Sequence, residues 1–196
     1  MRPMFNASAI TPILDEIFSH YNKLFQMKRE AAQIDIFNII HGCWMPHTAR
    51  CIMWMGGFRP SDVIELIMNH VEMLNGQKSK FDNLKEQFLN EEGEISKEFE
   101  DLQRNIATSL TGQDFVNKGD ECAMTNFASH MSSLTGKFTI FLDLMEKGDR
   151  LREKTLKEIR SILKEKQQAA SMLTLSDYFN RLVALTNLWE TRHKTI

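Results

Sequence analysis

The sequence is poor in the residues that reverse or break a chain. Only 9 glycines and 4 prolines occur among its 196 residues. A protein built from β-sheets usually needs more of these turn-forming residues, so the composition favours an all-α fold. No linker rich in proline, glycine or serine divides the chain, and we therefore expect a single domain.

A strong charge of one sign is also lacking. The chain carries 24 basic and 26 acidic residues, a formal net charge of −2. Nucleic-acid binding normally needs a strongly positive field, and no apolar run approaches the ~20 residues of a membrane span. The N-terminus lacks the apolar core of a signal peptide. We therefore expect no membrane association and a location in the nucleus or cytosol.

Cysteine is scarce as well. Three cysteines without paired spacing indicate a reducing compartment. Cys43 and Cys122 are candidate redox residues, whereas Cys51 lies in an apolar segment and is expected to be inert. Four possible zinc donors cluster at His41, Cys43, His47 and Cys51. Their spacing is not a usual structural-zinc pattern, so no metal site is predicted.

Catalytic patterns are missing from the sequence too. It has no glycine-rich phosphate loop, no nucleophile elbow and no paired carboxylates on a strand. We therefore expect a binding or regulatory domain that is not an enzyme and requires no cofactor.

Helical periodicity is what the sequence does contain. A first apolar stripe recurs at spacings of three and four from Ile13 to Ile40, after Thr11 as N-cap and Pro12 at the first helical position. Its predicted inward residues include Ile13, Ile17, Tyr21, Leu24, Met27 and Lys28. Further helices are predicted over about 46–55, 61–74, 77–109, 120–146, 150–166 and 167–189, with a loop over 112–119 and a break at Gly148. This gives a single bundle of about seven helices, with residues 13–191 as the domain, 1–12 as a disordered or non-native N-terminus and 192–196 as a tail.

Two of these helices have distinctive faces. The long amphipathic helix over 77–109 is either a coiled-coil dimerisation seam or a helix laid along its own domain. The helix over 150–166 carries many basic residues, Arg152 among them. Because glutamates are interspersed, we expect a solvated, ion-paired face there.

The predicted centre of the bundle is a corner. The apolar run 51–55 ends at Gly56 and Gly57, which can adopt positive φ and reverse the chain. Ser61 is a good N-cap for the next helix, and Asp62 lies in its first turn. The other helices are expected to pack around this corner.

Aromatic residues and an arginine near the corner are candidates for partner binding, because tryptophan and arginine are typical interface anchors. The candidates are Phe58, Arg59, Trp44 and Trp54. A place in the core is the alternative for Trp54, and a helix-capping role is the alternative for Arg59. If Arg59 acts in docking, Arg59→Glu should abolish partner binding and leave the thermal melt nearly unchanged.

The chain is rich in two adaptable apolar residues, with 12 methionines and 13 phenylalanines. Such side chains either fill a core or line a pocket for a long apolar ligand or a partner helix. The candidate pocket residues are Met53, Met124, Phe127, Met131 and Phe138.

Three stretches resemble known plant proteins. The stretches 20–37 and 44–61, the latter with Trp44, Trp54 and the Gly56–Ser61 corner, are similar to the delay-of-germination (seed dormancy) domain. The stretch 151–189 resembles the C-terminal half of plant TGA-type bZIP transcription factors. The similarity spans about residues 14 to 190.

This resemblance implies an all-helical regulatory domain in the nucleus, with some protein also in the cytoplasm. It implies binding to ankyrin-repeat, BTB-containing co-activators of the salicylic-acid pathway and to plant glutaredoxins, and it allows a homodimer. The chain has no basic region or leucine zipper, so DNA binding is expected only through a bZIP region absent from it. The alternative function is a ligand-sensing domain that binds a fatty acid or another apolar molecule.

Overall fold

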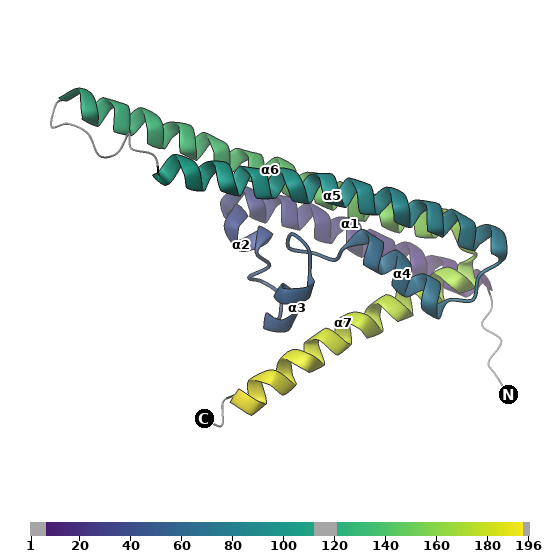
Figure 1. Cartoon of the computed structure of the whole chain (residues 1–196). Helices are drawn as coiled ribbons and strands as arrows, with labels where there is room; N and C mark the ends of the chain where they lie inside the picture. Colours follow the sequence, from purple (N-terminus) through teal and green to yellow (C-terminus); the bar gives the residue numbers. More distant parts are fainter. Residues whose placement is uncertain (1–6, 112–120, 194–196) are drawn as a thin grey trace.

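The computed structural model describes residues 7–111 and 121–193, which form seven helices (Figure 1). They are α1 (Ala7–Ile34), α2 (Ile36–Ile40), α3 (His47–Ile52), α4 (Pro60–His70), α5 (Asn75–Thr111), α6 (Glu121–Ile162) and α7 (Glu165–His193). No strand occurs in this described part, where one isolated backbone pairing joins Trp54 and Gly57. The predicted all-α fold of about seven helices is confirmed.

Two long helices form the frame of the molecule. Helices α5 and α6 pack along each other as an antiparallel hairpin, and α1 lies beside them (Figure 1). Helix α4 packs across α5, and α7 leaves the end of α6 and points away from the hairpin. None of the helices within the described ranges is long and apolar enough to cross a membrane. The predicted loop over 112–119 lies outside the described residues.

Helix α5 lies along its own domain. Its apolar face is buried in the common core through Phe81, Leu84, Phe88, Ile95 and Leu102. Because these side chains pack inside the chain, this face cannot also serve as a coiled-coil seam. Of the two predicted alternatives, the long amphipathic helix is therefore a helix laid along its own domain and not a coiled-coil seam.

Helix α1 buries a face that only partly matches the predicted one, since Lys28 is buried as predicted and Ile17 and Tyr21 are partly buried against the core. The buried residues are Leu14, Phe18, Phe25, Lys28 and Ala32. Ile13, Leu24 and Met27 of the predicted stripe are instead exposed. The two stripes lie one residue apart on the helix, and contacts with α6 and α7 select between them. The helix also begins at Ala7, so Thr11 is not its N-cap and instead donates a side-chain hydrogen bond to Glu165.

Helix α6 runs through Gly148 without a break. A Cβ at this position would lie 3.5 Å from both the Trp54 ring and Nη1 of Arg152. These are ordinary van der Waals distances, so the packing beside Gly148 does not depend on glycine, and the glycine does not end the helix. The prediction of two separate helices here is wrong, because a glycine in a helix costs only about 1 kcal/mol.

The corner, defined here as residues 53–59, joins α3 to α4. Gly56 has a φ of +66°, and a Cβ on it would lie 2.2 Å from the carbonyl oxygen of Ile39. The predicted glycine reversal is thus confirmed. Ser61 is not the N-cap as predicted, since α4 begins at Pro60 with Arg59 at the N-cap position.

Candidate functional site

A buried arginine from α6 binds the corner from inside. Arg152 is fully buried, and its Nε donates a 2.8 Å hydrogen bond to the carbonyl of Phe58. Its Nη2 donates to the carbonyls of Trp54 and Met55. A Cβ on Gly57 would lie 2.7 Å from Nε of this arginine. Glycine is therefore needed at position 57 so that the guanidinium can approach the backbone.

Lys28 and Arg152 share one carboxylate. Oδ1 of Asp149 lies 2.7 Å from Nζ of Lys28 and 2.5 Å from Nη1 of Arg152. All three side chains are almost completely buried, and Oδ2 of Asp149 has no hydrogen-bond partner within the described structure. Two cations thus share one carboxylate, and the buried carboxylate of Glu92 also acts electrostatically on Arg152. Burial, and then the nearby Arg152, lowers the pKa of Lys28 to about 8.

A buried glutamate from α5 binds the start of α4. Oε1 of Glu92 accepts a 2.7 Å hydrogen bond from the Ser61 backbone N–H, and Oε2 accepts a 2.8 Å bond from the Ser61 hydroxyl. A carboxylate at a helix N-terminus is favourably placed for the helix dipole. Burial nevertheless raises the pKa of Glu92, against the opposing effect of the Ser61 hydrogen bonds.

Trp54 lies between two arginines. Its ring centroid is 5.2 Å from Cζ of Arg152 and 6.0 Å from Cζ of Arg59. Its Nε1 donates a 3.0 Å hydrogen bond to Ser96 on α5, and only 7% of the residue is exposed. Trp54 therefore lies in the core, which was the alternative to a place in a partner interface. Phe58 is buried to a similar degree.

An apolar cavity of about 330 Å³ opens between α1, the corner and α7. Its walls include Leu24, Phe25, Met53, Phe179 and Leu182. Lys28 and Arg152 also line it, so two buried cationic side chains adjoin an apolar space. The arrangement suits a molecule with a long apolar part and a polar end.

A second space, which we call the Arg59 hollow, lies between the corner, α4 and α7. It has a volume of about 240 Å³ and includes Arg59, Asp62 and Tyr178 on its lining. The Arg59 side chain is 42% exposed, and its Nε lies 3.7 Å from Oε2 of Glu92. Met53 and Phe58 line both the hollow and the apolar cavity, and so separate them.

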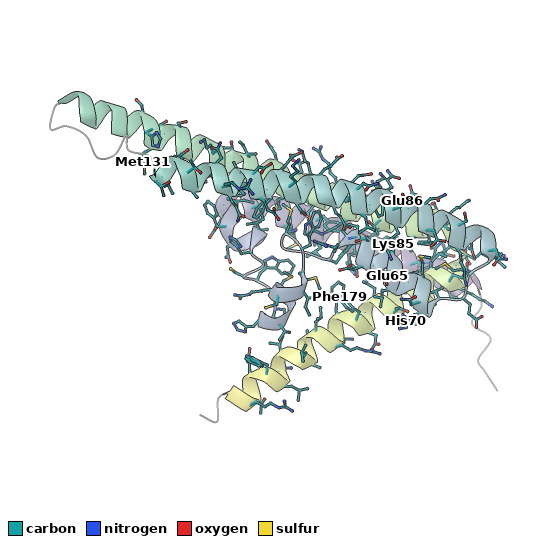
Figure 2. All side chains as sticks on the ribbon, viewed as in Figure 1. Glu65, His70, Lys85, Glu86, Met131 and Phe179 are labelled. Atoms are coloured by element: carbon teal, nitrogen blue, oxygen red, sulfur yellow. The ribbon has the colours of Figure 1, made fainter. Side chains whose placement is uncertain are left out.

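The structure brings some of the predicted site residues together and separates others. Trp44, which is 49% exposed, lines the cavity together with Met53. Phe138 lies elsewhere, in an edge-to-face contact with Phe37 at 5.1 Å. Figure 2 shows Met131 near the far end of the α5–α6 hairpin, well away from Phe179 on α7. The predicted pocket residues thus do not form one pocket, since helical spacing alone does not show which helices meet.

Three predicted residues belong to a part of α6 whose side chains lie outside the described residues. They are Cys122, Met124 and Phe127. Cys43 and Cys51 are both exposed, although Cys51 lies in an apolar segment of the sequence. Helix α3 buries only Ala49, whereas a buried helix was expected from its apolar composition. Among the described residues, no three histidines, cysteines, aspartates or glutamates converge as a metal site would require.

Sequence reasoning missed Arg152 as a functional residue. The predicted solvated face included it, whereas the structure buries it completely. A signal was present, because Arg152 continues the apolar register of Leu156, Ile159 and Leu163 at spacings of three and four. A cation in such a register has to find a buried partner.

Together the fold and these contacts define an all-helical domain built around a corner that Arg152 and Glu92 hold in place. A family model described as seed dormancy control (DOG1) matches residues 4–69. The predicted resemblance is confirmed, since residues 4–69 match this family model and nearly the whole chain is similar to TGA-type transcription factors.

The similarity to these transcription factors extends along nearly the whole chain. Transcription factor TGA2.3 of Oryza sativa subsp. japonica is 34% identical over 199 residues, which cover 99% of this chain and 60% of that protein. The TGACG-sequence-specific DNA-binding protein TGA-2.1 of Nicotiana tabacum is 32% identical over 98% of this chain and 43% of its own length. Transcription factor TGA2 of Arabidopsis thaliana is 31% identical over 98% and 59%. The chain therefore spans only about half of the length of these relatives.

Proposed function

We propose that this chain is a regulatory domain of a TGA-type transcription regulator and acts in the nucleus by docking a co-activator. The partner would be the ankyrin-repeat, BTB-containing co-activator of the salicylic-acid pathway that the resemblance implies. The similarity to plant transcription factors supports the regulatory part of this proposal. DNA binding would belong to a bZIP region outside this chain.

The half-exposed guanidinium of Arg59 is the observation that supports docking. Its ion pair with Glu92 is long, at 3.7 Å, and both oxygens of that carboxylate already accept hydrogen bonds from Ser61. Arg59 is therefore only weakly engaged within its own chain. Together with the adjoining hollow it offers a partner a cation beside an apolar surface, which is a common composition for an interface anchor.

The test replaces Arg59 with alanine and measures co-activator binding by pull-down and calorimetry. We expect at least a tenfold loss of affinity, about 1.4 kcal/mol, and little change in the thermal melt. Arg59→Glu, the variant suggested by the sequence, is a poorer test because it would place a second carboxylate beside Glu92. Arg104→Ala is the matched control, since its side chain is 71% exposed on α5. If Arg59→Ala and Arg104→Ala bind the co-activator equally well, Arg59 is not part of the interface.

A second candidate function is the binding of a long apolar acid such as a fatty acid. The apolar cavity supports it, because Lys28 and Arg152 add two buried cationic side chains to otherwise apolar walls. Native mass spectrometry of the purified protein tests this function. We expect a co-purifying mass, or retention of added palmitate, which is lost when Val183 at the cavity lining is changed to tryptophan. A ligand-free mass at saturating palmitate would contradict the proposal.

Two further contacts implied by the resemblance have less structural support. Cys43 is exposed, as a glutaredoxin contact would require. Homodimer formation would have to use a surface other than the buried face of α5.

A further inference from the structure

Lys28 is a buried amine on the lining of the apolar cavity. It lies on α1, and only 7% of the residue is exposed. Arg152 is the other charged residue among the described residues of the lining. Tyr21 also lines the cavity, and burial raises the pKa of its hydroxyl, so that group stays neutral at physiological pH. No charged side chain of α7 or the corner is found on this lining.

Of the two cations that share Asp149, Lys28 is the one that can release a proton. Arg152 is fixed by hydrogen bonds to three corner carbonyls, and a guanidinium keeps its proton in proteins. Loss of the Lys28 proton would leave Asp149 paired with Arg152 one to one. Deprotonation would also remove the repulsion between Lys28 and Arg152, which together with burial favours the neutral form of Lys28.

A desolvated lysine beside a second cation is the environment that turns an amine into a nucleophile for carbonyl compounds. Burial is the largest cause of the lowered pKa of Lys28, and Arg152 is the second. A pKa of about 8 instead of 10.5 gives Lys28 roughly 300 times the neutral fraction of an ordinary lysine at pH 7. The cavity beside the amine is apolar, so the carbonyl compound that reaches it is apolar as well.

We propose that Lys28 forms an imine with a long-chain aldehyde bound in the apolar cavity. The Nζ lone pair attacks the carbonyl carbon, a carbon–nitrogen double bond forms, and the carbonyl oxygen leaves as water. The ammonium and the aldehyde thus give a protonated imine and one water molecule. The protonated imine keeps a positive charge next to Asp149. The proposal rests on the cavity of the second candidate function and does not depend on co-activator docking.

The experiment treats the protein with nonanal and sodium cyanoborohydride at pH 7 and maps the modified lysines by peptide mass spectrometry. The reductant converts each imine to a stable secondary amine of fixed mass. We expect the rate of labelling at Lys28 to exceed that at the exposed Lys23 of the same helix by at least tenfold. Labelling of Lys28 at or below the rate of Lys23 would overturn the proposal, and this measurement needs only the wild-type protein.

Two variants locate the reaction. Lys28→Arg keeps the charge but lacks the nucleophile, and should lose the fast adduct while the circular dichroism spectrum stays unchanged. Val183→Trp narrows the cavity and should slow labelling of Lys28 at least fivefold without affecting Lys23. Unchanged labelling of Lys28 in this variant would show that the aldehyde does not react through the cavity, against the proposal.

The outcome can be separated from that of the fatty-acid proposal. Palmitate retention without fast labelling of Lys28 would refute the imine alone. Fast, cavity-dependent labelling of Lys28 without palmitate retention would support the imine proposal and refute the fatty-acid proposal. If neither occurs, both proposals fail, and the result for Arg59→Ala would still stand on its own.

Discussion

Two buried charges stabilise the corner, Arg152 from α6 and Glu92 from α5, and they differ in what they bind and in what balances them. Arg152 donates to the carbonyls of the corner, whereas Glu92 accepts from the N–H and hydroxyl of Ser61 at the start of α4. The corner and the following helix start thus lie between a cation and an anion. Each charge supplies the hydrogen-bonding group that the backbone next to it lacks.

The residues that neutralise Arg152 and Glu92 differ even more than the groups that these two bind. Arg152 is paired with Asp149, which is itself completely buried and shared with Lys28. Glu92 has Arg59 as its nearest cation, at 3.7 Å and 42% exposed. The cluster of Arg152, Asp149 and Lys28, which we call the cationic centre, therefore faces the apolar cavity. Glu92, which we call the anionic centre, is instead paired with the half-exposed Arg59. A partner that binds Arg59 would act on the Glu92 centre, and a ligand in the cavity would act on the Arg152 centre.

The largest effect is expected when Arg152 is replaced by methionine. The three corner carbonyls would lose this donor, and within the described structure only that of Trp54 would keep another, the Gly57 N–H. An unsatisfied buried group costs about 1–3 kcal/mol, and Asp149 would lose one of its two cations as well. We expect the free energy of unfolding to fall by more than about 3 kcal/mol in urea denaturation. Arg152→Lys should recover only part of this loss, because an ammonium lacks the planar fork that reaches several carbonyls. A loss below about 1 kcal/mol would show that the corner does not depend on this residue.

Replacing Glu92 by alanine should have a smaller effect. The Ser61 N–H and hydroxyl would lose their buried acceptor, but both groups can be partly satisfied by water entering beside the half-exposed Arg59. We expect a loss of about 2 kcal/mol in the same denaturation experiment. Glu92→Gln is the control, since it keeps one acceptor oxygen and should lose about 1 kcal/mol. If the two variants were equally destabilised, the charge of Glu92 rather than its hydrogen bonds would be the important property.

The two centres also show where sequence reasoning succeeds and where it stops. The helices and the reversal at Gly56 follow from local patterns, namely apolar periodicity and the tolerance of glycine for positive φ. The pairing of Arg152 with Phe58 joins residues 94 positions apart, and no local pattern encodes it. The basic residues around Arg152 also concealed it, because they made its segment look like a solvated face.

Burial on α1 was ambiguous for a related reason. Two apolar stripes lie side by side on this helix, and either could have faced the core. The choice depends on which helices pack against α1, whereas Lys28 was predicted to face inward and is buried. The sequence therefore pointed to single residues of the cavity, such as Met53 and Lys28, but not to Arg152, which distant helices bring beside Lys28.

The smallest effect at neutral pH is expected for Lys28→Met. Arg152 would still neutralise Asp149, so the free energy of unfolding at pH 7 should stay within about 1 kcal/mol of wild type. The difference between the two proteins should instead depend on pH. The folded-state pKa of Lys28, about 8, lies below the ordinary value of 10.5, so the unfolded state binds more protons between these two values.

Wild-type stability should therefore rise relative to Lys28→Met as the pH increases from about 8 to 10.5, by at most about 3 kcal/mol. Urea denaturation at pH 7, 8.5 and 10 measures the difference, with Lys23→Met as the control on the exposed side of α1. Parallel pH profiles for wild type and Lys28→Met would mean that Lys28 keeps its proton over this whole range. The cationic centre would then be as tightly balanced as a simple ion pair, and the contrast with the Glu92 centre would be lost.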